Sequence, residues 1–122
     1  MPATFDVHPE RKRVDVTLSG TMSVADLEQI TMALHDSPGF DPSFDVFTDA
    51  REVRFVIEPK EVMEFADFYC KYLASTTGRS ALLMSTPRET TLALIHKHAV
   101  RRRRTIEIFQ TQEAALKWLE GP

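Results

Sequence analysis

The chain has 122 residues, of which 43% are hydrophobic and 27% charged, and its formal net charge at pH 7 is −3. These proportions are typical of a folded globular protein and exclude a disordered or low-complexity chain. An acidic net charge also argues against a surface built as a whole for nucleic acid. The length predicts one domain over residues 1–122.

Cysteine content and hydropathy indicate the cellular compartment in which the protein is expected. The sequence contains one cysteine, Cys70, so an intramolecular disulfide is impossible. The first residues lack the apolar core of a secretory signal, and no apolar run approaches the roughly 20 residues that span a bilayer. We therefore expect a cytoplasmic protein without a transmembrane segment.

The N-terminal third predicts a hairpin followed by a helix. Apolar and polar residues alternate over 4–8 and 13–18, and the turn sequence PERK separates them, which is typical of two antiparallel strands. The segment SVAD at 23–26 has the form of a capping box and predicts a helix that continues to about His35. The segment SPGFDP at 37–42 cannot continue a helix and is expected to be a loop.

The middle of the chain predicts a strand, a helix and a second strand. FDVFTD at 44–49 is typical of a central strand because it is short, aromatic and β-branched. REVRFVI at 51–57 is ambiguous and forms either a further strand or a turn. Pro59 suits the first position of a helix, and apolar residues at helical spacing continue to about Ala74. ALLM at 81–84 is expected to be a buried strand.

The last third repeats this alternation. STPRE at 85–89 predicts the start of a helix with Thr86 as its cap, and TIEIF at 105–109 alternates as a strand. Thr111 caps a final helix that Gly121 ends. The resulting order, ββαβαβαβα, predicts an α/β fold. We expect one mostly parallel sheet, entered through an antiparallel N-terminal hairpin and covered by helices.

Three segments of the sequence resemble the STAS fold, and in particular its SpoIIAA-like branch of free-standing small bacterial domains. They are VTLSGTMSVADL, FDVFTDAREV and IEIFQTQEAALKWL, which together span nearly the whole chain. The resemblance implies a protein-interaction or ligand-sensing module, and the leading hypothesis is a non-enzymatic regulatory module that binds a partner protein. The best-known members are switched by phosphorylation of a serine at the start of the helix after the third strand. Here no serine or threonine lies between Asp49 and Ala74, so that switch has no phosphate acceptor.

A small-ligand sensor is the alternative function, because polar residues gather where predicted parallel strands end. Asp49 and Arg51 follow the central strand, and Ser85, Thr86 and Arg88 follow the next one. Open α/β sheets bind ligands at this edge, and the free N–H groups of a helix start favour an anion. These five residues predict a site for a small anionic or lipid-like ligand. Alternatively, Asp49 and Thr86 only hydrogen-bond their own loops.

Four consecutive arginines, Arg101, Arg102, Arg103 and Arg104, follow the third predicted helix. Two or three of them complement the dipole at the C-terminal end of that helix. As a basic patch they would instead dock to an acidic protein or to an anionic membrane surface. Base-stacking aromatic residues are lacking nearby, so specific nucleic-acid binding is not expected.

Other candidate groups yield little chemistry. His96 and His98 diverge on a helix, so neither a metal site nor any cofactor is expected. Cys70 lies near an apolar stripe, where a buried inert thiol is the usual state, and no catalytic motif is present, so we expect no enzyme activity. Met63, Phe68 and Tyr72 fall partly off the core stripe of their helix. They indicate either a wide core stripe or a second buried surface, such as a homodimer interface.

Overall fold

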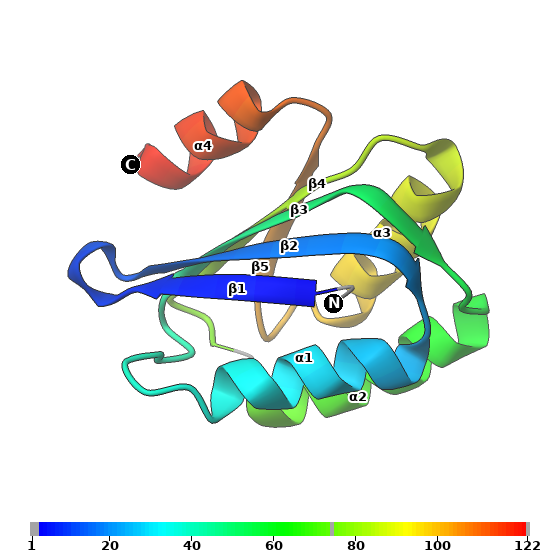
Figure 1. The fold of residues 1–122 in the computed structure, drawn as a ribbon, viewed down its shortest axis with the longest axis horizontal. Helices are drawn as coiled ribbons and strands as arrows, with labels where there is room; N and C mark the ends of the chain where they lie inside the picture. The colour runs from blue at the N-terminus through cyan, green and yellow to red at the C-terminus, as the bar shows by residue number, and fades with distance from the viewer. Residues whose placement is uncertain (1–2, 74, 122) are drawn as a thin grey trace.

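The computed structural model describes residues 3–73 and 75–121, which form one five-stranded sheet and four α-helices (Figure 1). The strands are β1 (Ala3–His8), β2 (Arg13–Met22), β3 (Asp45–Phe55), β4 (Arg79–Leu83) and β5 (Thr105–Phe109). The helices are α1 (Val24–His35), α2 (Pro59–Tyr72), α3 (Pro87–Ala99) and α4 (Gln112–Glu120), and a 3₁₀ turn, Pro9–Arg11, joins β1 to β2. The predicted element order is confirmed.

The strands lie in the sheet in the order in which they occur in the chain, β1-β2-β3-β4-β5. β1 pairs antiparallel with β2, and every later pair is parallel. Successive crossovers of the same right-handed sense, each advancing by one strand, place their helices on the same face of the sheet. Accordingly α1, α2 and α3 cover one face, whereas α4 lies on the other (Figure 1). The α/β class with one antiparallel hairpin is confirmed.

Local capping signals set the starts of the helices as predicted. The N–H of Asp26 donates to the Ser23 hydroxyl at 3.2 Å, and the N–H of Ser23 donates to the Asp26 carboxylate at 2.9 Å. Thr86 accepts from the N–H of Glu89 in the same way. Each such cap contributes about 1 kcal/mol, because it satisfies a backbone donor that the helix itself leaves free.

The ambiguous segment 51–57 is mostly strand, because β3 continues through Phe55. β2 and β3 pair beyond the end of β4, after a register shift between Thr17 and Ser19. α2 begins at Pro59 as predicted and ends at Tyr72, while its expected end at Ala74 lies outside the described residues. No helix in the described part of the chain combines the length and apolarity needed to cross a bilayer.

Alternation along the strands divides the core into two layers. On β3, Phe47 packs on the α4 side with Ala115 and Leu119. Val46 and Ala50, at the alternate positions, belong to the larger layer under α1, α2 and α3. The larger layer holds the cavity described next.

Candidate functional site

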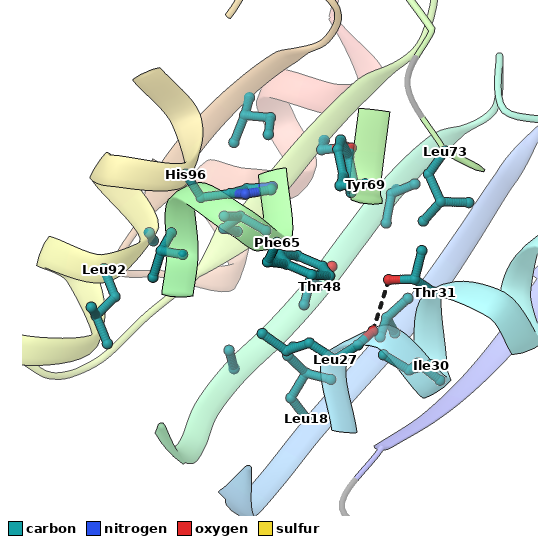
Figure 2. Close-up of a pocket in the computed structure, with 18 of the residues that line it drawn as sticks. Leu18, Leu27, Ile30, Thr31, Thr48, Phe65, Tyr69, Leu73, Leu92 and His96 are labelled. Carbon is teal, nitrogen blue, oxygen red and sulfur yellow. Dashed lines mark hydrogen bonds between the residues drawn. The ribbon is translucent and has the colours of Figure 1, made fainter. Parts of the chain in front are cut away.

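A cavity of about 160 Å³ lies between the sheet and helices α1, α2 and α3 (Figure 2). Its walls are almost entirely apolar, and Asp, Glu, Lys and Arg are lacking among the described residues that line it. All three helices and the four strands β2 to β5 contribute to it; among the lining side chains are Leu18, Leu27, Ile30, Thr31, Thr48, Ala50, Phe65, Tyr69, Leu73, Ser80, Leu82, Leu92, Ala93 and His96.

The cavity exists because small side chains of the sheet face small side chains of the helices that cover it. Thr48 and Ala50 occupy alternate positions of β3, and Ser80 lies on β4 opposite Val46. Thr31 of α1 and Ala93 of α3 are the small residues of the helical wall. Protein interiors are normally packed as tightly as organic crystals, so a void of this size is unusual. An engineered apolar cavity of about 150 Å³ stays dry and binds benzene, which indicates what a void of this size can hold.

His96 is the one imidazole among the described residues that line the cavity. It projects from α3 toward α2, where its ring stacks on Phe65 with centroids 5.5 Å apart and meets Tyr69 edge-on at 4.8 Å (Figure 2). Its Nδ1 is buried and has no hydrogen-bond partner among the described residues. Burial lowers the pKa of His96 from 6.5 to about 4, so the ring is uncharged at neutral pH.

Tyr69 marks a second polar position in the wall. Burial raises the pKa of its phenol, while the Arg104 guanidinium and the Ser80 hydroxyl act in the opposite direction. Nε of Arg104 donates to the Ser80 hydroxyl at 3.0 Å behind the wall. The Thr31 hydroxyl donates to the backbone carbonyl of Leu27 at 2.8 Å and is therefore satisfied. The site thus offers neutral polar groups within an apolar enclosure.

Three of the residues predicted to bind an anion lie together beside the carboxyl end of β4. Asp49 and Arg51 lie within β3, which continues to Phe55, so the prediction that they follow the central strand is wrong. The Arg51 guanidinium donates to both oxygens of Asp49, at 3.0 and 2.8 Å. This hydrogen bond is the main reason that the pKa of Asp49 lies below its usual value. The Ser85 hydroxyl donates to the carbonyl of Arg51 at 2.7 Å. The cluster has the polar groups that were predicted, and they are paired with one another.

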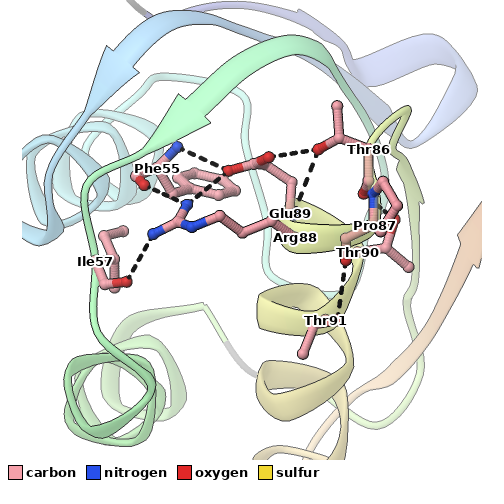
Figure 3. Close-up of polar contacts among 8 residues, drawn as sticks. All are labelled: Phe55, Ile57, Thr86, Pro87, Arg88, Glu89, Thr90 and Thr91. Atoms are coloured by element: carbon pink, nitrogen blue, oxygen red, sulfur yellow. Dashed lines mark hydrogen bonds and ion pairs between the residues drawn. The ribbon is translucent and has the colours of Figure 1, made fainter.

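Thr86 and Arg88 take part in a neighbouring network around Glu89 (Figure 3). The Glu89 side chain is buried and accepts from the N–H of Phe55 at 3.2 Å, from the Thr86 hydroxyl, and from Arg88 at 2.8 Å. Arg88 also donates to the carbonyls of Phe55 and Ile57. Burial raises the pKa of Glu89, but these hydrogen bonds outweigh it and the net pKa is lowered. The network fastens the start of α3 to the end of β3.

The sequence pattern identified Thr86 and Arg88 but did not identify Glu89 as the centre of this network. Glu89 contacts a backbone N–H that lies 34 residues earlier in the chain, and nothing local indicates that contact. Anion binding at Asp49, Arg51, Ser85, Thr86 and Arg88 stays a prediction.

The four arginines divide into two groups. Arg101, Arg102 and Arg103 are exposed and make up the surface part of the predicted basic patch. Arg104 is 2% exposed, so it does not belong to that surface. Its guanidinium donates to the backbone carbonyls of Pro42 and Phe44 at 2.6 and 2.8 Å.

The remaining candidates lie apart from one another. His98 is exposed, whereas His96 lines the cavity, and no group of three or more potential metal ligands occurs within residues 3–73 and 75–121. Cys70 is half-buried, and burial raises the pKa of its thiol. Met63 is 50% exposed, and the half-buried ring of Phe68 lines a shallow groove on α1 and α2.

Comparison with known proteins supports the fold. No family model and no curated protein matches the sequence. Among solved structures, the chain is similar to an uncharacterised protein of the DUF3478 family with a SpoIIAA-like fold from Shewanella loihica PV-4. The TM-score is 0.60 at 14% identity, and the match covers 96% of this chain and 93% of that one. The chain therefore has a SpoIIAA-like fold, which confirms the fold expected from the sequence.

Proposed function

We propose that this protein is a non-enzymatic, STAS-type binding module that holds a small, predominantly apolar molecule between its sheet and helices α1 to α3. The cavity of about 160 Å³ carries the proposal. A tightly packed domain gains stability by filling such a void, since burial of each CH₂ group is worth about 0.8 kcal/mol. A cavity of this size between the side chains therefore favours a binding role.

The walls of the cavity define the class of ligand. Apolar and aromatic side chains surround it, and its few polar groups are neutral at pH 7. An anion in this space would lose its hydration without gaining a charge partner in the wall. The proposed ligand is thus uncharged, and it occupies the space under the helices rather than the polar cluster of Asp49, Arg51 and Ser85.

A titration with toluene, followed by NMR of ¹³C-labelled methyl groups, tests this function. We expect saturable shifts at the cavity methyls of Leu18, Ile30 and Leu92. The methyls of Leu119, which lies on α4 and packs on the opposite face of the sheet, should not move. Shifts spread evenly over both faces, or no saturable shift at any cavity methyl, would contradict the proposal.

A matched pair of variants locates the binding. Ala93→Leu places three further carbons into the cavity from α3, whereas Ala33→Leu makes the same change on the exposed side of α1. We expect Ala93→Leu to weaken toluene binding by at least tenfold and Ala33→Leu to leave it unchanged. Equal binding by both variants would place toluene outside the cavity.

Partner-protein binding is a second candidate function, and the groove on the outer side of α1 and α2 favours it. Ala25, Met32 and Phe68 line this groove together with the polar residues Glu28 and Gln29. Apolar and aromatic side chains at a surface are typical of protein interfaces. The partner would be a second copy of the chain or a different protein.

Sedimentation equilibrium distinguishes these partners for the purified protein. A dimer that Phe68→Ser converts to a monomer, while the control Leu94→Ser on α3 does not, would support self-association through the groove. A monomer at all concentrations tested would exclude self-association.

A further inference from the structure

We infer that the apolar ligand carries one hydroxyl group, which hydrogen-bonds to His96. This inference rests on the proposed function and specifies the chemistry of its ligand. The observation behind it is Nδ1 of His96, a buried polar atom in a residue of the cavity wall that lacks a partner among the described residues. Buried polar atoms are almost always hydrogen-bonded in folded proteins, so an orphaned one in a binding cavity points to a group supplied by the ligand.

The position of the ring favours a partner from the cavity. Phe65 and Tyr69 contact the imidazole through their rings, at 5.5 and 4.8 Å between centroids. In Figure 2 the His96 ring extends from α3 toward these two side chains. Aromatic carbon cannot replace a hydrogen bond, so this part of the wall does not satisfy the nitrogen.

A hydroxyl fits this nitrogen better than other polar groups. In a neutral imidazole one ring nitrogen donates and the other accepts, and the tautomer decides which role Nδ1 has. A hydroxyl both donates and accepts, so it satisfies Nδ1 in either tautomer. A ketone or an ether satisfies only the donor form.

A carboxylate is excluded by charge. The described residues of the cavity wall include no cation, and Arg104, which lies behind Tyr69 and Ser80, already donates four hydrogen bonds inside the protein. A buried carboxylate beside a neutral imidazole would lack a positive partner. The three rings of His96, Phe65 and Tyr69 also provide flat faces on which an aromatic ligand can pack. Phenol is therefore the simplest suitable test ligand.

Phenol and toluene form a matched pair, because they have the same number of non-hydrogen atoms and differ in a hydroxyl against a methyl group. The dissociation constants of both are measured by the methyl NMR titration for wild type, His96→Phe, and the control His98→Phe on the exposed side of α3. We expect the preference for phenol over toluene to fall about three- to tenfold in His96→Phe, which is the range of one hydrogen bond. His98→Phe should retain the wild-type preference.

A second measurement uses wild type alone, so it does not require the His96→Phe variant to fold. In ¹⁵N-histidine-labelled wild type, phenol should shift the His96 ring nitrogens with the same saturation curve as the cavity methyls, whereas toluene should shift the methyls with little change at nitrogen. If toluene does not bind wild type at all, the proposed function fails. If toluene binds but the phenol preference is equal in wild type and His96→Phe, and phenol leaves the His96 nitrogens unshifted, the inference about the hydroxyl fails and the proposed function stands.

Discussion

Acidification should destabilise the protein through His96 between pH 6.5 and pH 4. The pKa of this side chain is about 4 in the folded protein, where the ring is buried, and 6.5 in the unfolded chain, where it is not. Above pH 6.5 the ring is neutral in both states and stability is unaffected. As the pH falls below 6.5, the unfolded chain takes up a proton that the folded chain does not, so unfolding becomes more favourable.

The size of the effect follows from the two pKa values. One unit of pKa shift corresponds to about 1.4 kcal/mol, so the full loss across the window is roughly 3 kcal/mol. Between pH 7.5 and pH 4.5 the loss from His96 alone is about 2.5 kcal/mol, because the folded form begins to protonate near the lower limit. That is a large part of the 5–15 kcal/mol by which domains are typically stable.

Urea unfolding at pH 7.5 and at pH 4.5 measures this loss. Carboxylates titrate over part of the same range, so the comparison is made with His96→Phe, which has the same carboxylates but no imidazole at this position. We expect the variant to lose about 2.5 kcal/mol less than wild type over this interval. The exposed His98→Phe should behave as wild type. Parallel losses in wild type and His96→Phe, within about 0.5 kcal/mol, would refute a buried neutral imidazole.

Three further substitutions test the packing and the buried polar groups, each by urea unfolding at pH 7. Ala93→Leu should stabilise the protein by up to about 2 kcal/mol if its carbons enter the cavity, whereas a packed wall would make it destabilising by about 1–3 kcal/mol. Glu89→Ala should lower the free energy of unfolding by about 3 kcal/mol, whereas the exposed Glu64→Ala should change it little. The stabilisation by Glu89 should decline below about pH 4.5, because its pKa is lowered in the folded protein and the unfolded chain takes up the proton first. Arg104→Lys should lower the free energy of unfolding by about 2–4 kcal/mol, since an ammonium group cannot reproduce the hydrogen bonds of the guanidinium. The exposed Arg103→Lys should lower it by less than about 0.5 kcal/mol.

The order of strands and helices could be predicted because the signals that set it are local. The capping box at Ser23, the threonine caps and Pro59 each act within one helical turn, and the structure begins its helices at those positions. Segment 51–57 was ambiguous because its strand character depends on pairing with β2, which lies more than 30 residues earlier. Pairing at that distance is absent from any short window of sequence.

The cavity could not be predicted for the same physical reason. Thr48 and Ala50 are ordinary strand residues in the sequence, and Thr31 and Ala93 are ordinary helix residues. A void forms only because the fold places these four short side chains in the same space. Their alternate spacing in FDVFTDA, with small residues on the inward face of a central strand, is the one sequence signal that suggests it.

The sequence also did not show which arginine of the run RRRR is buried, or which of the two neighbouring histidines lines the cavity. The run RRRR gives no indication that Arg104 is buried, since the carbonyls that bind it are about 60 residues upstream. Helical geometry predicted that His96 and His98 diverge, but it did not indicate which of them meets a cavity. In both cases the deciding contact comes from a distant segment.

Crystals of the protein placed under xenon pressure test the central claim most directly, because xenon occupies dry apolar cavities and scatters X-rays strongly. We predict xenon density between the sheet and helices α1 to α3, beside Thr48 and Ala93, and no comparable density on the α4 side. A space filled by side chains or by ordered water, with no xenon bound, would contradict an apolar binding cavity and the function proposed from it.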